Sequence, residues 1–76
     1  MPKLRRATAE ETIRALERMG FTQVRQRGSH VVLKKQTDGG EIVCVVPLHR
    51  RRLAIGTLRS ILRQANVTPD EFLVHL

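Results

Sequence analysis

Hydrophobic residues at the start of the chain repeat with the period of a helix. The apolar positions spaced i, i+4 and i+7, which predict an amphipathic helix over residues 9–19, are Ala9, Ile13 and Leu16. Thr8 and Glu11 have the spacing of a capping box, in which each side chain accepts a hydrogen bond from the other residue's backbone N–H. Gly20 follows, where a left-handed residue often ends a helix.

Strand-like runs rich in β-branched residues occupy the middle of the chain. Two turn signals, at 28–29 (Gly-Ser) and at 37–40 (Thr-Asp-Gly-Gly), separate runs over 21–27, 30–35 and 41–46. Asp-Gly between two such runs is typical of a β-hairpin. Because both connecting loops are short, the three runs predict an antiparallel meander.

The last third of the chain returns to helical spacing. Gly56 and Thr57 open a second predicted helix, whose apolar positions at i, i+3, i+4 and i+7 are Leu58, Ile61, Leu62 and Ala65. Thr68 and Glu71 form a second capping box around Pro69, which stands in the first helical position. This combination predicts a short final helix.

Together these elements predict one α+β domain over residues 1–76, in the order α-β-β-β-α with a short C-terminal helix. We expect two layers, with the helices on one face of a three-stranded antiparallel sheet. The other face of the sheet is expected to be open to solvent or to a partner. Phe21 and Phe72 are the two aromatic residues, and both are expected in the core.

The balance of charge indicates a polyanionic partner. Fourteen Lys and Arg against seven Asp and Glu give a formal net charge of +7. Such an excess favours nucleic acid first, then an anionic membrane or an acidic protein, with simple solvation of the surface as the alternative. The charged N-terminus and the lack of an apolar run of about 18 residues argue against a signal peptide and a membrane span. We therefore expect a cytoplasmic protein.

Composition argues against several kinds of site. Four of the seven acids fall in the first turns of predicted helices, where the helix dipole explains them: Glu10, Glu11, Asp70 and Glu71. The other acids form no pair suited to Mg²⁺, the three histidines lack ligand spacing, and the single cysteine, Cys44, fits a buried apolar position. We therefore expect no metal and no cofactor. Two core aromatics also leave none for base stacking, so nucleic acid would be held through phosphates and sugars.

His30 is the candidate catalytic residue. It follows the first turn, with Arg25 and Arg27 before it and Lys34 after it. Histidine exchanges a proton near physiological pH, and RNA supplies its own nucleophile, the 2′-OH. A base surrounded by cations is therefore the minimum that RNA cleavage needs. On the residues alone, a histidine hydrogen-bonded at a strand end remains the more common explanation.

Further residues are candidate ligands of the RNA. The full set of candidates is Arg25, Arg27, Ser29, Lys34, Arg50, Arg51, Thr57 and Arg59. The arginines at 50–52 are consecutive, so at most two share a face, and they are either phosphate clamps or a solvated loop. Thr57 opens a helix whose first N–H groups could meet a phosphate. His49 is a weaker candidate of the same type as His30. No feature of the sequence argues for a function of His75.

Four ordered motifs closely resemble those of the HicA family of bacterial and archaeal toxins. They are Gly20-Phe21, Arg25-Gln26-Arg27-Gly28-Ser29-His30, Val46-Pro47-Leu48-His49 and Gly56-Thr57-Leu58-Arg59-Ser60-Ile61-Leu62. Their order and spacing extend the resemblance over about residues 8–73. Two positions depart from the family pattern. Arg52 stands where many members carry an acid, and Asn66 stands where glycine is common.

The resemblance implies a fold like that of double-stranded-RNA-binding domains and the activity of a ribosome-independent mRNA interferase. It also implies that His30 is the catalytic histidine, and that a HicB antitoxin binds the toxin and masks it. The hypothesis is a metal-independent endoribonuclease acting on RNA. The main alternative is a non-catalytic double-stranded-RNA-binding module, and a DNA-binding regulator is disfavoured because no helix-turn-helix pattern is evident.

Overall fold

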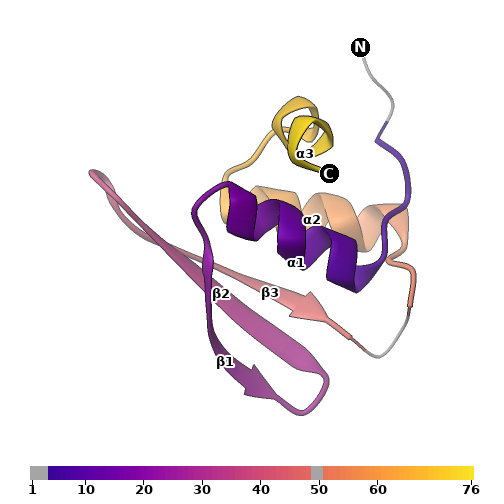
Figure 1. The fold of residues 1–76 in the computed structure, drawn as a ribbon, viewed down its shortest axis with the longest axis horizontal. Coiled ribbons are helices and arrows are strands. Elements are labelled where there is room, and N and C mark those ends of the chain that lie inside the picture. The colour runs from indigo at the N-terminus through magenta and orange to yellow at the C-terminus, as the bar shows by residue number, and fades with distance from the viewer. Residues whose placement is uncertain (1–3, 49–50) are drawn as a thin grey trace.

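The computed structural model describes residues 4–48 and 51–76. Its elements are α1 (Ala9–Arg18), β1 (Thr22–Arg27), β2 (His30–Thr37), β3 (Gly40–Pro47), α2 (Ile55–Ala65) and α3 (Pro69–His75). The α+β class and the order α-β-β-β-α with a short final helix are confirmed (Figure 1). No helix within these two ranges is long and apolar enough to cross a membrane.

The sheet is an antiparallel meander in the order β1-β2-β3. β2 and β3 pair without interruption from His30 opposite Pro47 to Thr37 opposite Gly40. Both strands therefore extend further toward the hairpin tip than the expected runs over 30–35 and 41–46. The reason is that a two-residue loop lets the ladder continue up to the turn. The Thr37 hydroxyl also closes the tip by donating to the Gly40 carbonyl at 2.7 Å.

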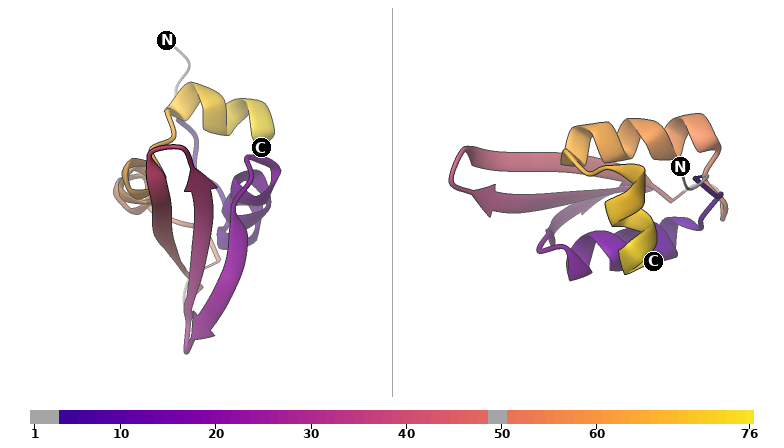
Figure 2. Two further views of the ribbon diagram at one scale, coloured as in Figure 1. Left: turned by 90° about the vertical axis from the view of Figure 1, so that its left-hand side faces the viewer. Right: turned by 90° about the horizontal axis from the view of Figure 1, so that it is seen from above.

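One face of the sheet forms the floor of the core. Its fully buried side chains lie opposite one another in the register, Val31 with Val46 and Leu33 with Cys44. In the left view of Figure 2 the sheet lies in front, and α1 and α2 both lie behind it. Over the described residues the helices thus cover one face and leave the other open, as expected.

The core is closed by apolar side chains from all three helices. They include Leu16 from α1, Leu58, Ile61 and Leu62 from α2, and Phe72 from α3. Phe21 is buried as well, so both aromatic residues occupy the core as predicted. Cys44 is also buried, and its loss of hydration raises the pKa of the thiol to about 11.

The first and last helices, α1 and α3, each begin with a capping box. The Thr8 hydroxyl accepts from the Glu11 N–H at 3.0 Å, and the Glu11 carboxylate accepts from the Thr8 N–H at 2.9 Å. Thr68 and Glu71 repeat this pair of bonds at the start of α3. Both boxes were predicted from local spacing, and both are confirmed.

The second helix differs slightly from the prediction at its start. α2 begins at Ile55, one residue early, after Ala54, whose side chain makes no capping bond. At the other end Asn66 adopts the left-handed conformation, with φ of 57° and ψ of 42°. Its N–H donates to the Arg63 carbonyl at 3.1 Å, which satisfies one of the last free carbonyls of the helix.

The segment before α1 pairs with the segment that precedes α2, a contact with no signal in the sequence. The Leu53 N–H donates to the Ala7 carbonyl at 2.9 Å, and the Ala9 N–H donates to the Arg51 carbonyl at 3.1 Å. Ala7 and Leu53 are both buried. This pairing fixes the backbone of Arg51 at the start of α1.

Candidate nucleic-acid interface

The open face of the sheet carries four of the nine candidate residues. Side chains of directly paired residues in antiparallel strands point to the same face. By the register, this face carries Thr22, Arg25 and Arg27 from β1, His30, Val32 and Lys34 from β2, and Val43, Val45 and Pro47 from β3. The structure thus places His30 on the same face as Arg25, Arg27 and Lys34.

A tight turn fixes the position of His30. Arg27 pairs with His30 across a two-residue loop, so their side chains are neighbours on the sheet. Gly28 has a φ of 56°, a left-handed conformation that glycine adopts at little cost. Ser29 is half-buried, and its carbonyl accepts a hydrogen bond from the Leu48 N–H, which ties the turn to the end of β3. His30 is exposed at the start of β2.

β1 contains a bulge at Val24 that was not predicted. The register passes from Gln23 opposite Leu33 to Arg25 opposite Val32, which leaves Val24 without a partner of its own. Regular alternation would place residues 21, 25 and 27 on the same face. Phe21 is buried in the core, however, whereas Arg25 faces away from it. One extra residue in the strand resolves this conflict.

The cations of the open face differ in how they are paired. Lys34 Nζ lies 3.4 Å from a Glu41 carboxylate oxygen, and both side chains are substantially exposed. Arg25 and Arg27 are exposed and form no ion pair within the described part of the chain. The two arginines of β1 are therefore the cations best placed to meet a phosphate beside His30.

A shallow depression of about 430 Å³ adjoins His30 on the side of α2. The residues that line it are His30, Val45, Pro47, Gly56, Thr57, Ser60, Ile61 and Gln64. α2 lies along β3 at this point, and the Gln64 Oε1 accepts a hydrogen bond from the Val45 N–H at 3.1 Å. Of the candidates outside the sheet, Thr57 is thus brought to the same depression as His30.

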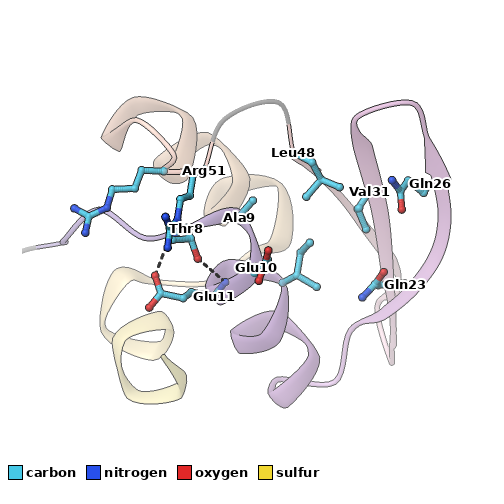
Figure 3. Close-up of a pocket in the computed structure, with 11 residues that line it drawn as sticks. Thr8, Ala9, Glu10, Glu11, Gln23, Gln26, Val31, Leu48 and Arg51 are labelled. Atoms are coloured by element: carbon cyan, nitrogen blue, oxygen red, sulfur yellow. Dashed lines mark hydrogen bonds between the residues drawn. The ribbon is translucent and has the colours of Figure 1, made fainter.

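Two other candidates lie elsewhere, and a third is outside the described residues. Arg59 is exposed on α2 but does not line the depression. Arg51 lines a separate groove between the start of α1 and β1, together with Glu10 and Gln23 (Figure 3). Arg50 and the weaker candidate base His49 lie outside the described residues.

The other histidines, cysteines and acids of the described residues form no metal site. Within residues 4–48 and 51–76, no three His, Cys, Asp or Glu side chains gather into a group that could hold a metal ion. His75 lies on α3, where its Nδ1 is 2.8 Å from the Glu71 carbonyl. Cys44 is buried in the core.

Six residues of the depression were not predicted as site residues, and two of them, Ser60 and Gln64, have polar side chains. They share one side of α2 with Thr57 and Ile61, because these four positions are spaced i, i+3, i+4 and i+7. The stripe can be found in the sequence. Its contact with β3 cannot, because no local signal shows which side of α2 meets the sheet next to His30.

A comparison with models of protein families decides where this chain belongs. The model of the HicA toxin of bacterial toxin–antitoxin systems matches residues 9–67. The chain belongs to the HicA toxin family. The matched span of this HicA toxin includes the three strands β1 to β3 and the two helices α1 and α2, and therefore both His30 and the depression. No curated protein sequence matches the chain.

Proposed function

We propose that this HicA toxin is a metal-independent endoribonuclease that cleaves mRNA. The observation that carries the proposal is the placement of His30, exposed on the open face and paired in register with Arg27. A histidine among cations is suited to general-base chemistry on a phosphodiester. RNA provides the nucleophile, so the proposed reaction uses no cofactor.

In this reaction His30 removes the proton from a ribose 2′-OH. The 2′-oxygen then attacks the adjacent phosphorus, the bond between phosphorus and the 5′-oxygen breaks, and the leaving oxygen takes a proton from water. The products are a 2′,3′-cyclic phosphate and a 5′-hydroxyl. Arg25 and Arg27 stabilise the negative charge that accumulates on the phosphate oxygens.

The other candidates act as RNA ligands in the same proposal. Lys34 contacts the backbone further along the open face, and the hydroxyls of Ser29 and Thr57 donate to phosphate oxygens. The outer phosphate contacts are assigned to Arg50, Arg51 and Arg59. Such contacts position RNA without reading its sequence.

A HicB-like antitoxin is the proposed protein partner, and the cytoplasm is the proposed location. Membership of a toxin family from toxin–antitoxin systems supports the existence of such a partner. His30 is exposed on a face that no helix covers in the described part of the chain, so a bound protein can mask it. Masking would stop cleavage without a change in the fold of the toxin.

Replacement of His30 by alanine tests the catalytic assignment. We expect RNA cleavage to fall by at least about 100-fold and growth arrest to be lost, because the general base is removed. The unfolding temperature should change little, since the side chain is exposed. His75→Ala is the matched control, because this histidine lies on α3. Cleavage of RNA by purified His30→Ala protein would refute the assignment.

Cleavage in the presence of EDTA tests the proposed independence from metals. We expect full activity, because the base is His30 and the nucleophile is the 2′-OH of the substrate. The measurement is the rate of cleavage of a defined RNA with EDTA and with added Mg²⁺. Strict dependence on a divalent cation would overturn the mechanism.

A non-catalytic double-stranded-RNA-binding module is the second candidate. The α-β-β-β-α order and the cations on the open face favour it. This alternative predicts salt-sensitive RNA binding without turnover, and an effect of His30→Ala on affinity alone. The cleavage assay with purified protein therefore distinguishes the two functions.

A further inference from the structure

The depression beside His30 differs chemically from the rest of the open face. None of the described residues that line it is Lys, Arg, Asp or Glu. Its apolar surface comes from Val45, Pro47 and Ile61, and its polar groups other than His30 are hydroxyls and one amide. The arginines of the open face, Arg25 and Arg27, lie on the opposite side of β2, on β1. His30 therefore stands between a charged half of the face and a neutral half.

Gln64 has a defined orientation in this depression. The Val45 N–H can only donate, so the oxygen of the Gln64 amide must face it, and the two atoms are 3.1 Å apart. Val45 belongs to β3, whose outer edge pairs with no other strand of the described sheet. The amide nitrogen, with two donors, forms no hydrogen bond within residues 4–48 and 51–76.

We infer that the depression is a base-recognition subsite and that Gln64 is its specificity-determining residue. The inference rests on the proposed ribonuclease function, because it places a nucleotide over His30. The phosphate of that nucleotide lies toward the arginines of β1, and its base lies toward β3 and α2. The Thr57 hydroxyl then donates to the phosphate of the next nucleotide. Val45 and Pro47 contact the flat ring, while the Gln64 nitrogen donates to an acceptor on the edge of the base.

The donor on Gln64 selects a class of base. In this proposal the Gln64 nitrogen faces the 6-position of a purine or the 4-position of a pyrimidine. Guanine and uracil carry a carbonyl oxygen there, and adenine and cytosine carry an amino group. The carbonyl accepts the Gln64 hydrogen bond, whereas an amino group would place two donors opposite each other and leave both unsatisfied. The subsite therefore prefers a keto base, guanine or uracil, at one position next to the cleaved bond.

The substitution Gln64→Glu separates base recognition from structure. Glutamate keeps an oxygen for the Val45 N–H but replaces the amide nitrogen by an acceptor. We expect a loss of about tenfold in the preference for keto bases, with a shift toward adenine and cytosine at the same position. Sequencing the ends of the RNA fragments measures this preference. Asn66→Asp is the matched control, because it adds the same charge at the C-terminal end of α2, outside the depression, and should leave the preference unchanged.

A binding experiment makes the inference independent of cleavage. Two proteins are compared in a His30→Ala background, one with Gln64 intact and one with Gln64→Glu. Short oligonucleotides with keto or amino bases compete for each protein, and fluorescence anisotropy measures their relative affinities. A reversal of the preference by Gln64→Glu supports the subsite.

The other outcomes of this experiment separate the subsite from the proposed function. An unchanged preference, or none in either protein, overturns the subsite even if the toxin cleaves RNA. Base-selective binding by a wild-type protein that does not cleave RNA would refute the ribonuclease and keep the subsite.

Discussion

Hydrogen bonds of the folded state lower the pKa of two carboxyl groups, those of Glu11 and Glu71. The backbone N–H of Thr8 lowers the pKa of Glu11, and the backbone N–H of Thr68 lowers the pKa of Glu71, each from an ordinary value of 4.5. A group with a lowered pKa binds fewer protons in the folded state than in the unfolded state. The stability that both caps contribute is therefore complete above the ordinary pKa and is lost as the pH falls through the lowered values.

The substitution Glu11→Gln tests this linkage. Glutamine can still accept the hydrogen bond from the Thr8 N–H, but it does not titrate. We expect the urea midpoint of the variant to fall less steeply than that of the wild type as the pH drops from about 5 to about 3. Glu10→Gln is the control, because Glu10 lies in the same turn but does not form the capping bond. Equal flattening in both variants would contradict the explanation.

Among the elements, α2 depends on a single backbone conformation at its C-terminal end. Asn66 adopts φ of 57° there, where a residue with a Cβ is normally disfavoured. Asparagine tolerates this region better than other residues, and glycine tolerates it best. The helix ends there, and the chain changes direction before α3 begins at Pro69.

Two substitutions at Asn66 separate backbone strain from side-chain contacts. We expect Asn66→Ala to lower the free energy of unfolding by about 1 kcal/mol, and Asn66→Gly to leave it equal or slightly higher. Urea denaturation measures both values. Asn66 is exposed, so little packing is lost in either variant. A similar loss in both would instead assign a role to the amide group.

On the scale of the whole molecule, the proposed interaction with RNA depends on the net charge of +7. Each phosphate contact releases counterions, so affinity falls as salt rises. The arrangement of the fold decides which cations contribute. Arg25 and Arg27 lie on the open face, whereas Arg14 is exposed on α1, which covers the other face.

The salt dependence of RNA binding tests this distribution of charge. In a His30→Ala background, we expect Arg25→Ala and Arg27→Ala each to reduce the slope of log affinity against log salt by about 0.7 for single-stranded RNA. Arg14→Ala should change the slope much less, and it serves as the control for net charge. Equal effects of all three variants would show that binding depends on total charge and not on the open face.

Local signals in the sequence account for the elements and for part of the site. The capping boxes, the two turns and the alternation along β2 and β3 act between residues close in the chain, so they could be predicted. The two-residue turn also places Arg27 beside His30 through local pairing. The observed bounds differ from the predicted ones at the tip of the β2–β3 hairpin and at the start of α2. Both places are ends of elements, where local signals are weakest.

Contacts between distant segments could not be predicted in this way. The bulge at Val24 arises because the core requires Phe21 on one face while the turn fixes Arg27 on the other. The bond from Val45 to Gln64 joins residues 19 positions apart and exists only because α2 packs along β3. The sequence by itself therefore determined the elements, their order and the pairing of Arg27 with His30. Only the tertiary structure decided the depression beside it, because packing and not local propensity sets which side of a helix meets a strand.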